Sequence, residues 1–316
     1  MEHASRTTTP AFSLLPRPDT SDGAPRRVGV EVEFAGLDLS QTAHMIVTTL
    51  GGTVSHTEDH ALSVTNTSLG DITVELDTAL TKLGEGVAVD AILDVARQVV
   101  PVEIVTEPLA PDALPNLDTL MSALRRAGAR GSRDGLVYGF GVHLNVEIAG
   151  RDDAFVGETV RAYGLLEHIL RADMQIDNTR RVLPFVQPWP DRLVADLLAE
   201  GVLDLAKLMT IYARHTQSRN HGLDLLPLLK WAAAEPFDRH FPGVKSAARP
   251  AFHFRLPESR IDEPDWSLAQ AWAQWLQVER LADDPTLVRA MAEARRRSDR
   301  TKALRAVLET RGNDDV

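Results

Sequence analysis

The stretch RRVGVEVEF, residues 26–34, has the alternation of a β-strand and sets the expectation for the rest of the chain. Its apolar side chains occur at every second position, as Val28, Val30, Val32 and Phe34. Alternate side chains share one face of a strand, so Glu31 and Glu33 lie roughly 6.5–7 Å apart on the other face. Like charges on neighbouring positions of a sheet face are destabilising unless something neutralises them. We therefore expect this face to serve a function.

Three more predicted strands combine one apolar face with one face of polar groups. They span residues 72–77, 141–148 and 251–256. Their polar positions are Thr73, Glu75 and Asp77, then His143, Asn145 and Glu147, and last His253 and Arg255. Any one such strand is explained by an antiparallel sheet with a wet face. Four of them together favour a shared site, and oxygen ligands without cysteine favour Mg²⁺ or Mn²⁺ over Zn²⁺.

The composition excludes several classes of protein. The 316 residues include 34 Lys and Arg against 45 Asp and Glu, a formal net charge of −11, so we expect no binding to nucleic acid or to an anionic membrane. The chain has no cysteine, which excludes disulfides and thiolate chemistry. It shows no signal-peptide pattern and no apolar run long enough to cross a membrane. We expect a cytoplasmic protein.

The order of the predicted elements indicates an α+β protein. Strands dominate the first half, apart from helices over residues 41–50, 85–99 and 113–127. Helices dominate the second half, over 152–175, 191–214, 265–283 and 285–309. Hairpin-like spacing favours a mostly antiparallel sheet over alternating βαβ units. The predicted organisation is a flexible leader over 1–24, a main domain over 25–285, and a C-terminal helix and tail over 286–316.

No nucleotide-loop or nucleophile motif is present. The sequence lacks G-x-G-x-x-G, G-x-x-x-x-G-K-[ST], G-x-S-x-G and H-E-x-x-H. Dinucleotide-binding, P-loop, α/β-hydrolase and zincin interpretations therefore lose their best support.

Five motifs in order resemble the amidoligase family of bacteria and fungi, within the glutamine synthetase and glutamate–cysteine ligase superfamily. VGVEVEF resembles its G-x-E-x-E strand, and GVHLNV its G-h-H-h-[HN] strand. NTSLGDITVELDTAL resembles D-G-S-L…E-h-h-S-P through Ser68, Leu69, Gly70 and Glu75. SRNHGLDLLPLL resembles R-Y-x-x-L-N-h through Arg219, and HFR resembles E-F-R through Arg255. The resemblance spans roughly residues 26–285.

The resemblance implies a glutamine synthetase catalytic-domain-like fold, with a curved, mostly antiparallel sheet. One face of that sheet would be a polar active-site face, and helices would cover the other. It also implies an ATP-dependent carboxylate–amine ligase that forms an amide through an acyl phosphate, on an amino-acid, polyamine or peptide-like substrate. The implied cofactors are ATP and Mg²⁺ or Mn²⁺. A glutamine-amidotransferase-like or amidase protein in the same pathway is the implied partner.

The resemblance also assigns roles to residues. The metal ligands would be Glu31, Glu33, Glu75 and His253. The catalytic residues would be His143, on metal or phosphate, and Arg255, on the phosphate or acyl phosphate. Asn145, Arg219 and Ser68 would bind the nucleotide or substrate.

The chain departs from the family pattern at four places. Asn66 stands where the family often has Asp, and Thr78-Ala79 replaces Ser-Pro. Asp224 lies near the expected Asn, and His253 replaces the Glu that precedes the arginine. That Glu often helps to bind metal in the superfamily, so the departure leaves two alternatives open. One is a metal-dependent hydrolase on the same acidic face, and the other is a degenerate nucleotide- or metal-binding protein.

Overall fold

The structure, a computed structural model, describes residues 12–58, 60–76, 101–132, 139–174, 186–295 and 305. Eight strands are hydrogen-bonded into one sheet in the order β2-β3-β4-β5-β1-β6-β8-β7. The strands are β1 (Val28–Phe34), β2 (Thr53–Glu58), β3 (Ala61–Thr67), β4 (Gly70–Leu76), β5 (Val102–Thr106), β6 (Val142–Glu147), β7 (Leu223–Asp224) and β8 (Ala251–Phe254). The strand pairings within β2–β5, of β5 with β1, and within β6, β8 and β7 are all antiparallel. The predicted mixed protein with an antiparallel sheet is confirmed.

The chain divides into two compact units, each made of three segments. The first unit contains Met1–Leu14, Gly29–Val142 and Glu258–Gln274. The second unit contains Leu15–Val28, His143–Pro257 and Trp275–Val316. Each unit therefore draws on both ends of the chain, and β1 and the long helix α10 (Leu268–Ala282) begin in one unit and end in the other.

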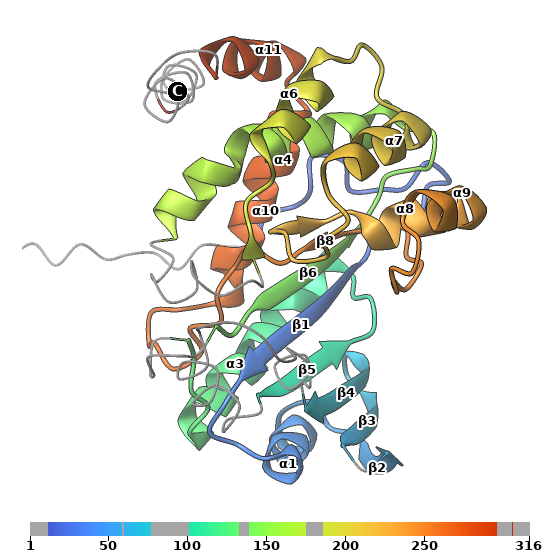
Figure 1. The fold of residues 1–316 in the computed structure, drawn as a ribbon. Coiled ribbons are helices and arrows are strands. Elements are labelled where there is room, and N and C mark those ends of the chain that lie inside the picture. Colours follow the sequence, from blue (N-terminus) through green and yellow to red (C-terminus); the bar gives the residue numbers. More distant parts are fainter. Residues whose placement is uncertain are drawn as a thin grey trace, which may run out of the picture. The chain divides into compact units, whose positions relative to one another are not determined.

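In the first unit, helix α1 (Leu39–Leu50) lies against strands β2, β3 and β4, and a second helix packs on α1 (Figure 1). Helix α1 begins at Asp38, whose side chain accepts the Gln41 amide hydrogen in a capping box. Helix α3 (Leu114–Ala127) follows the short 3₁₀ turn η1 (Pro111–Ala113) and packs on α1. The buried face of the sheet carries Val32, Val74 and Ile104. The alternate positions of these strands, on the opposite face, are only half-buried.

The second unit is mainly helical. Its further helices are α4 (Ala154–Asp173), α6 (Asp191–Ala199), α7 (Leu205–His215), α8 (Leu226–Ala232), α9 (Ala234–His240) and α11 (Pro285–Ala294). Helix α4 packs against α6, α7 and α11, and α8 packs against β8. The Trp275 ring, on α10, lies 5.3 Å from the Phe252 ring and 5.5 Å from the Phe254 ring. The aromatic face of β8 is thus buried against α10, which turns His253 to the opposite face.

A buried ion pair fixes the start of β1 within the second unit. Arg26 and Glu279 are fully buried, and the guanidinium Nη1 and Nη2 donate to the two carboxylate oxygens at 2.9 and 2.7 Å. The Nε of Arg26 also donates to the Glu147 carbonyl, so the pair connects β1, β6 and α10. Removing one partner of such a pair costs about 3–5 kcal/mol because the other charge stays buried.

The described part of the expected leader, residues 12–24, is mostly exposed but makes several contacts with the rest of the chain. Leu15 is buried, and Arg17 forms ion pairs with Asp153 and Asp283. The Trp272 indole N–H donates to the Ser13 carbonyl. Apolar burial and these charge contacts compensate the conformational entropy that ordering the segment costs.

Other predicted elements hold to different degrees. The strand at 28–34 has the predicted bounds. The helix predicted over 191–214 is wrong as one element, because α6 ends at Ala199 and α7 begins at Leu205 after the Asp204 cap. The helix predicted over 85–99 lies outside the described residues. None of the helices that the structure describes is both long and apolar enough to cross a membrane.

Candidate functional site

Three glutamates from three neighbouring strands form a line across the sheet in the first unit. Glu33 on β1 lies directly opposite Glu103 on β5, and Glu103 lies directly opposite Glu75 on β4. We call these three residues the carboxylate row. A carboxylate oxygen of Glu33 lies within 4.8 Å of one of Glu103, and all three residues are half-buried. The sequence-predicted Glu31 lies on the same face of β1, opposite Val105.

The carboxylate row places like charges opposite one another twice in succession. Directly opposite residues of an antiparallel pair have Cβ atoms about 4.5–5.5 Å apart, and like charges there are destabilising. Half-burial strengthens the repulsion because the local dielectric is lower than that of water. Carboxylate oxygens are the hard donors that Mg²⁺ and Mn²⁺ prefer, and the oxygens of Glu33 and Glu103 lie close enough to share one ion. The donor set therefore fits the predicted metal.

Glu33 is positioned by more than its own strand. Its backbone N–H donates to the Gly141 carbonyl at 3.0 Å, and its Oε2 accepts the Gly141 N–H at 2.8 Å. This two-point contact sets the direction of the carboxylate. It also ties the first glycine of the GVHLNV motif to the GVEVEF motif, so two of the five motifs meet here.

A second line of polar side chains crosses the sheet in the second unit. Asp224 on β7 lies opposite His253 on β8, and His253 lies opposite Asn145 on β6. We call these three residues the histidine row. All are buried, with Asp224 completely so. The sequence-predicted His143 is also buried, and its ring lies edge-on to His253 with centroids 5.3 Å apart.

The buried carboxylate of the histidine row lies beside the His253 ring and the Arg219 guanidinium. The His253 Nδ1 lies 3.5 Å from the Asp224 Oδ2, and the Arg219 Nε donates to the same oxygen at 3.1 Å. Burial raises the pKa of Asp224, but the contact with His253, the charge of Arg219 and the Leu226 amide outweigh burial and hold the pKa below its ordinary value. Asp224 is therefore a carboxylate at neutral pH, and it orients the Arg219 guanidinium and the His253 ring.

Arg255 follows β8 and is held from two sides. Its backbone N–H donates to the Gly222 carbonyl, and its Nη1 donates to the Arg219 carbonyl at 2.8 Å. Its Nε is buried and has no hydrogen-bond partner among the described residues. An orphaned buried guanidinium donor is costly, and it is a donor that an anionic ligand satisfies.

The structure separates one predicted residue from the others. Ser68 is exposed, in the turn between β3 and β4. Glu75 lies near the other end of β4, and the rise of a strand places it roughly 17 Å from the turn. Ser68 therefore does not join the carboxylate row, and its predicted nucleotide contact stays a prediction.

Two residues of these rows are absent from the predicted site. Glu103 lies in PVEIVTEPLA, which is predicted from the sequence only as an extended segment. Val102, Ile104 and Thr106 alternate around it, and this alternation could have placed Glu103 on the polar face of a strand. Asp224 lies in a two-residue strand, which is too short to show a period. Its neighbours in space are determined by the sheet register, and no local pattern contains that information.

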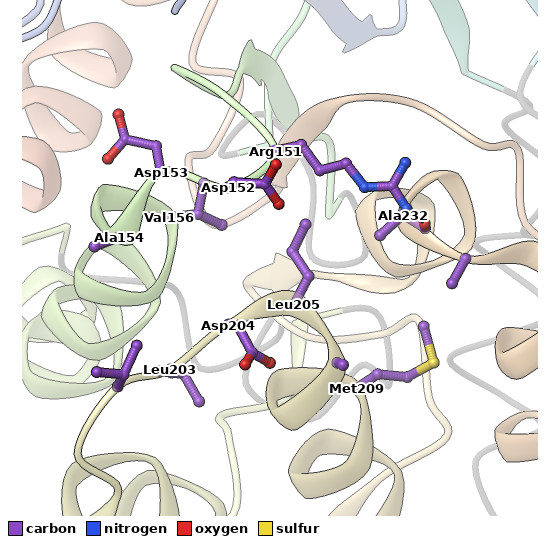
Figure 2. Close-up of a pocket in the computed structure, with 13 residues that line it drawn as sticks. Arg151, Asp152, Asp153, Ala154, Val156, Leu203, Asp204, Leu205, Met209 and Ala232 are labelled. Atoms are coloured by element: carbon purple, nitrogen blue, oxygen red, sulfur yellow. Dashed lines mark hydrogen bonds between the residues drawn. The ribbon is translucent and has the colours of Figure 1, made fainter.

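The described residues of the second unit also enclose a pocket of about 450 Å³ away from the histidine row (Figure 2). Its floor is apolar and includes Leu203, Leu205 and Met209. Three aspartates and one arginine line it, and the Arg151 guanidinium bonds the Ala232 carbonyl. None of the sequence-predicted site residues lines this pocket.

The fold and the two rows define a mixed α/β protein whose sheet presents carboxylates in one unit and a histidine–arginine cluster in the other. The chain belongs to the family described as "Putative amidoligase enzyme", whose model matches residues 24–277. The predicted family is thereby confirmed, and it indicates a ligase-type enzyme. No curated protein matches the chain.

Proposed function

We propose that the protein is an ATP-dependent carboxylate–amine ligase that works through an acyl phosphate. The observation that carries the proposal is the carboxylate row, where Glu33, Glu103 and Glu75 lie directly opposite one another. Membership of the amidoligase family supports the ligase class. The antiparallel sheet with helices on one face in the first unit supports the further proposal of a glutamine synthetase catalytic-domain-like fold.

The carboxylate row would hold Mg²⁺ or Mn²⁺, with Glu31 as a further ligand. When bound, the ion neutralises charge on the ATP phosphates during transfer. The protein's own part is to hold three carboxylates in one direction before the nucleotide arrives. Glu33 does so through the Gly141 amide, and the register of β1, β5 and β4 does so for the row as a whole.

Within the second unit, we propose that Arg255 and its polar neighbours bind an oxyanion such as a phosphate or an acyl phosphate. Arg255 would donate from its buried Nε to a phosphate oxygen, an interaction that strengthens as negative charge develops in transfer. His143 would contact the phosphate or a metal, and Asn145 and Arg219 would position nucleotide or substrate. His143 and Asn145 are buried, so water competes weakly for their hydrogen bonds.

His253 stands where the resemblance places a glutamate, and the structure suggests how the site accommodates it. The Asp224 carboxylate lies 3.5 Å from the His253 ring, so we propose that Asp224 supplies the acid that residue 253 lacks. The change His253→Glu would put two carboxylates side by side in a buried row. We expect it to weaken Mg-ATP binding, whereas higher activity would mean that His253 marks a loss of function.

Trapping the acyl phosphate tests the proposed reaction. Purified protein with Mg-ATP, hydroxylamine and a panel of amino acids and peptides should release ADP and form a hydroxamate from one of the acids. Both products should require metal and ATP. Amide cleavage without ATP would favour the metal-dependent hydrolase, and metal-dependent ATP binding without either product would favour a degenerate binding protein.

The remaining assignments stay predictions. They are ATP and Mg²⁺ or Mn²⁺ as cofactors, a glutamine-amidotransferase-like or amidase protein as partner, and a cytoplasmic location. The expectation that the protein binds neither nucleic acid nor membrane rests on its net charge of −11.

A further inference from the structure

The second unit carries an open groove whose lining is cationic although the chain is acidic. Its volume is about 530 Å³, within the range of small-molecule sites, and it lies among Arg219, Lys230, Asp238 and the loop 243–247. We call it the cationic groove. Three cations and one acid line it, whereas the protein has a formal charge of −11. A local reversal of sign raises the concentration of anions at that place.

The loop of the cationic groove is fixed at both ends. Gly243 adopts a left-handed φ of 77°, which glycine tolerates without strain, and the Val244 amide donates to the Phe241 carbonyl. At the far end, the Arg249 amide donates to the Pro227 carbonyl. Within the described residues, the amides of Lys245, Ser246 and Ala247 donate no hydrogen bond to the protein. The backbone N–H groups of such a short loop can donate hydrogen bonds to an oxyanion.

Arg219 connects the cationic groove to the histidine row. Its Nε donates to Asp224, while its carbonyl accepts from Arg255. Its side chain is 41% exposed, and within the described part of the chain it hydrogen-bonds only through Nε. The Nη1 and Nη2 groups therefore remain to donate to a ligand in the groove, in the fork geometry that carboxylates and phosphates match.

We propose that the cationic groove binds a second anionic group, carboxylate or phosphate, of the acid substrate. The proposal rests on the proposed ligase and deepens it, because it makes the acid a dianion or polyanion with one anionic group distant from the reacting carboxylate. A neutral side chain would leave three cations facing one acid in the groove, with Arg219 also paired to Asp224. The 450 Å³ pocket of Figure 2 has the opposite balance, with three aspartates against one arginine, and disfavours such a group.

Direct binding of anionic probes tests the cationic groove independently of activity. Calorimetric titration with inorganic pyrophosphate and with glutarate should show saturable binding to the intact protein. The change Lys245→Glu should weaken pyrophosphate binding about tenfold, and Asp238→Asn should tighten it. The matched control is Lys207→Glu, the same charge change at an exposed lysine of the same unit, and it should leave binding unchanged.

Each result has a definite meaning. Equal weakening by Lys245→Glu and Lys207→Glu would overturn the proposal, because the protein's general field would then explain binding. Failure of both probes to bind would also overturn it. Loss of probe binding in saturating Mg-ADP would overturn the assignment to the acid substrate. It would indicate that the groove binds the phosphates of the nucleotide. If the groove binds pyrophosphate but the protein forms no hydroxamate, the proposed ligase activity would be refuted. The cationic groove would then stand as an anion-binding site.

Discussion

The carboxylate row and the histidine row are built in the same way and have opposite electrostatics. Each consists of three polar residues placed opposite one another on neighbouring antiparallel strands. The first row is entirely acidic, whereas the second pairs the buried Asp224 with His253 and Arg219. The two rows therefore differ in charge, because the first contains three carboxylates and the second sets one carboxylate beside a histidine and an arginine. From this difference we propose that the carboxylate row binds metal and that the histidine row orients the reactants.

The largest expected effect comes from removing one charge of the carboxylate row. The change Glu103→Gln keeps the size of the side chain and should weaken metal-dependent Mg-ATP binding by about a hundredfold, or about 2.7 kcal/mol. Calorimetric titration with Mg-ATP measures it. Glu107→Gln, just beyond β5, is the matched control and should bind as the wild type does. Equal affinity of the Glu103 variant and the wild type would remove the metal role from this row.

Removing one charge from the histidine row should lower the stability of the folded protein. Asp224→Asn leaves His253 beside a neutral amide in a buried place, so we expect the free energy of unfolding to fall by about 1–3 kcal/mol. Chemical denaturation at neutral pH measures it. An unchanged midpoint would mean that the pair is not part of what holds β7 against β8.

The pH dependence of that difference follows from the pKa of Asp224. Because this pKa is lowered in the folded protein from its ordinary value of 3.8, the ionised carboxylate stabilises the fold above about that pH. The contribution is lost as the pH falls through the folded-state pKa. Denaturation of the wild type and of Asp224→Asn from pH 7 down to 3 measures the difference between their free energies of unfolding. That difference should stay constant down to about pH 4 and shrink below it. A difference in unfolding free energy that already shrinks between pH 7 and 5 would assign the effect to another titrating group.

The smallest effect has the opposite sign to that of Asp224→Asn. Without metal, Glu103→Gln should stabilise the protein by about 0.2–1 kcal/mol, because it relieves repulsion from two opposite carboxylates. Thermal unfolding in a chelator compares the variant with the wild type. Destabilisation there would show that the carboxylate row is balanced by the protein itself.

The sequence predicts the two rows unequally, and the reason is physical. Alternation along β1 is local, so the bounds of 28–34 and the shared face of Glu31 and Glu33 can be read directly. Glu103 joins the row only through the pairing of β5 with β1 and β4, which is long-range. Asp224 likewise joins the histidine row through register with His253.

Packing also changes what the predicted residues do. His143, Asn145 and His253 are predicted on a polar face that four strands share, and all three are buried. Their burial comes from long-range packing, which no local pattern specifies. Ser68 fails to join the row for the converse reason, because a motif close in sequence to Glu75 is spread along the length of β4.

Titration of the wild type with Mn²⁺, followed by electron paramagnetic resonance, tests the metal claim most directly. The carboxylate row predicts saturable binding to the wild type that is lost in Glu103→Gln and kept in Glu107→Gln. Mg²⁺ should displace the Mn²⁺ competitively. Identical titration curves for the wild type and Glu103→Gln would contradict the central claim that the three opposed glutamates hold a divalent cation.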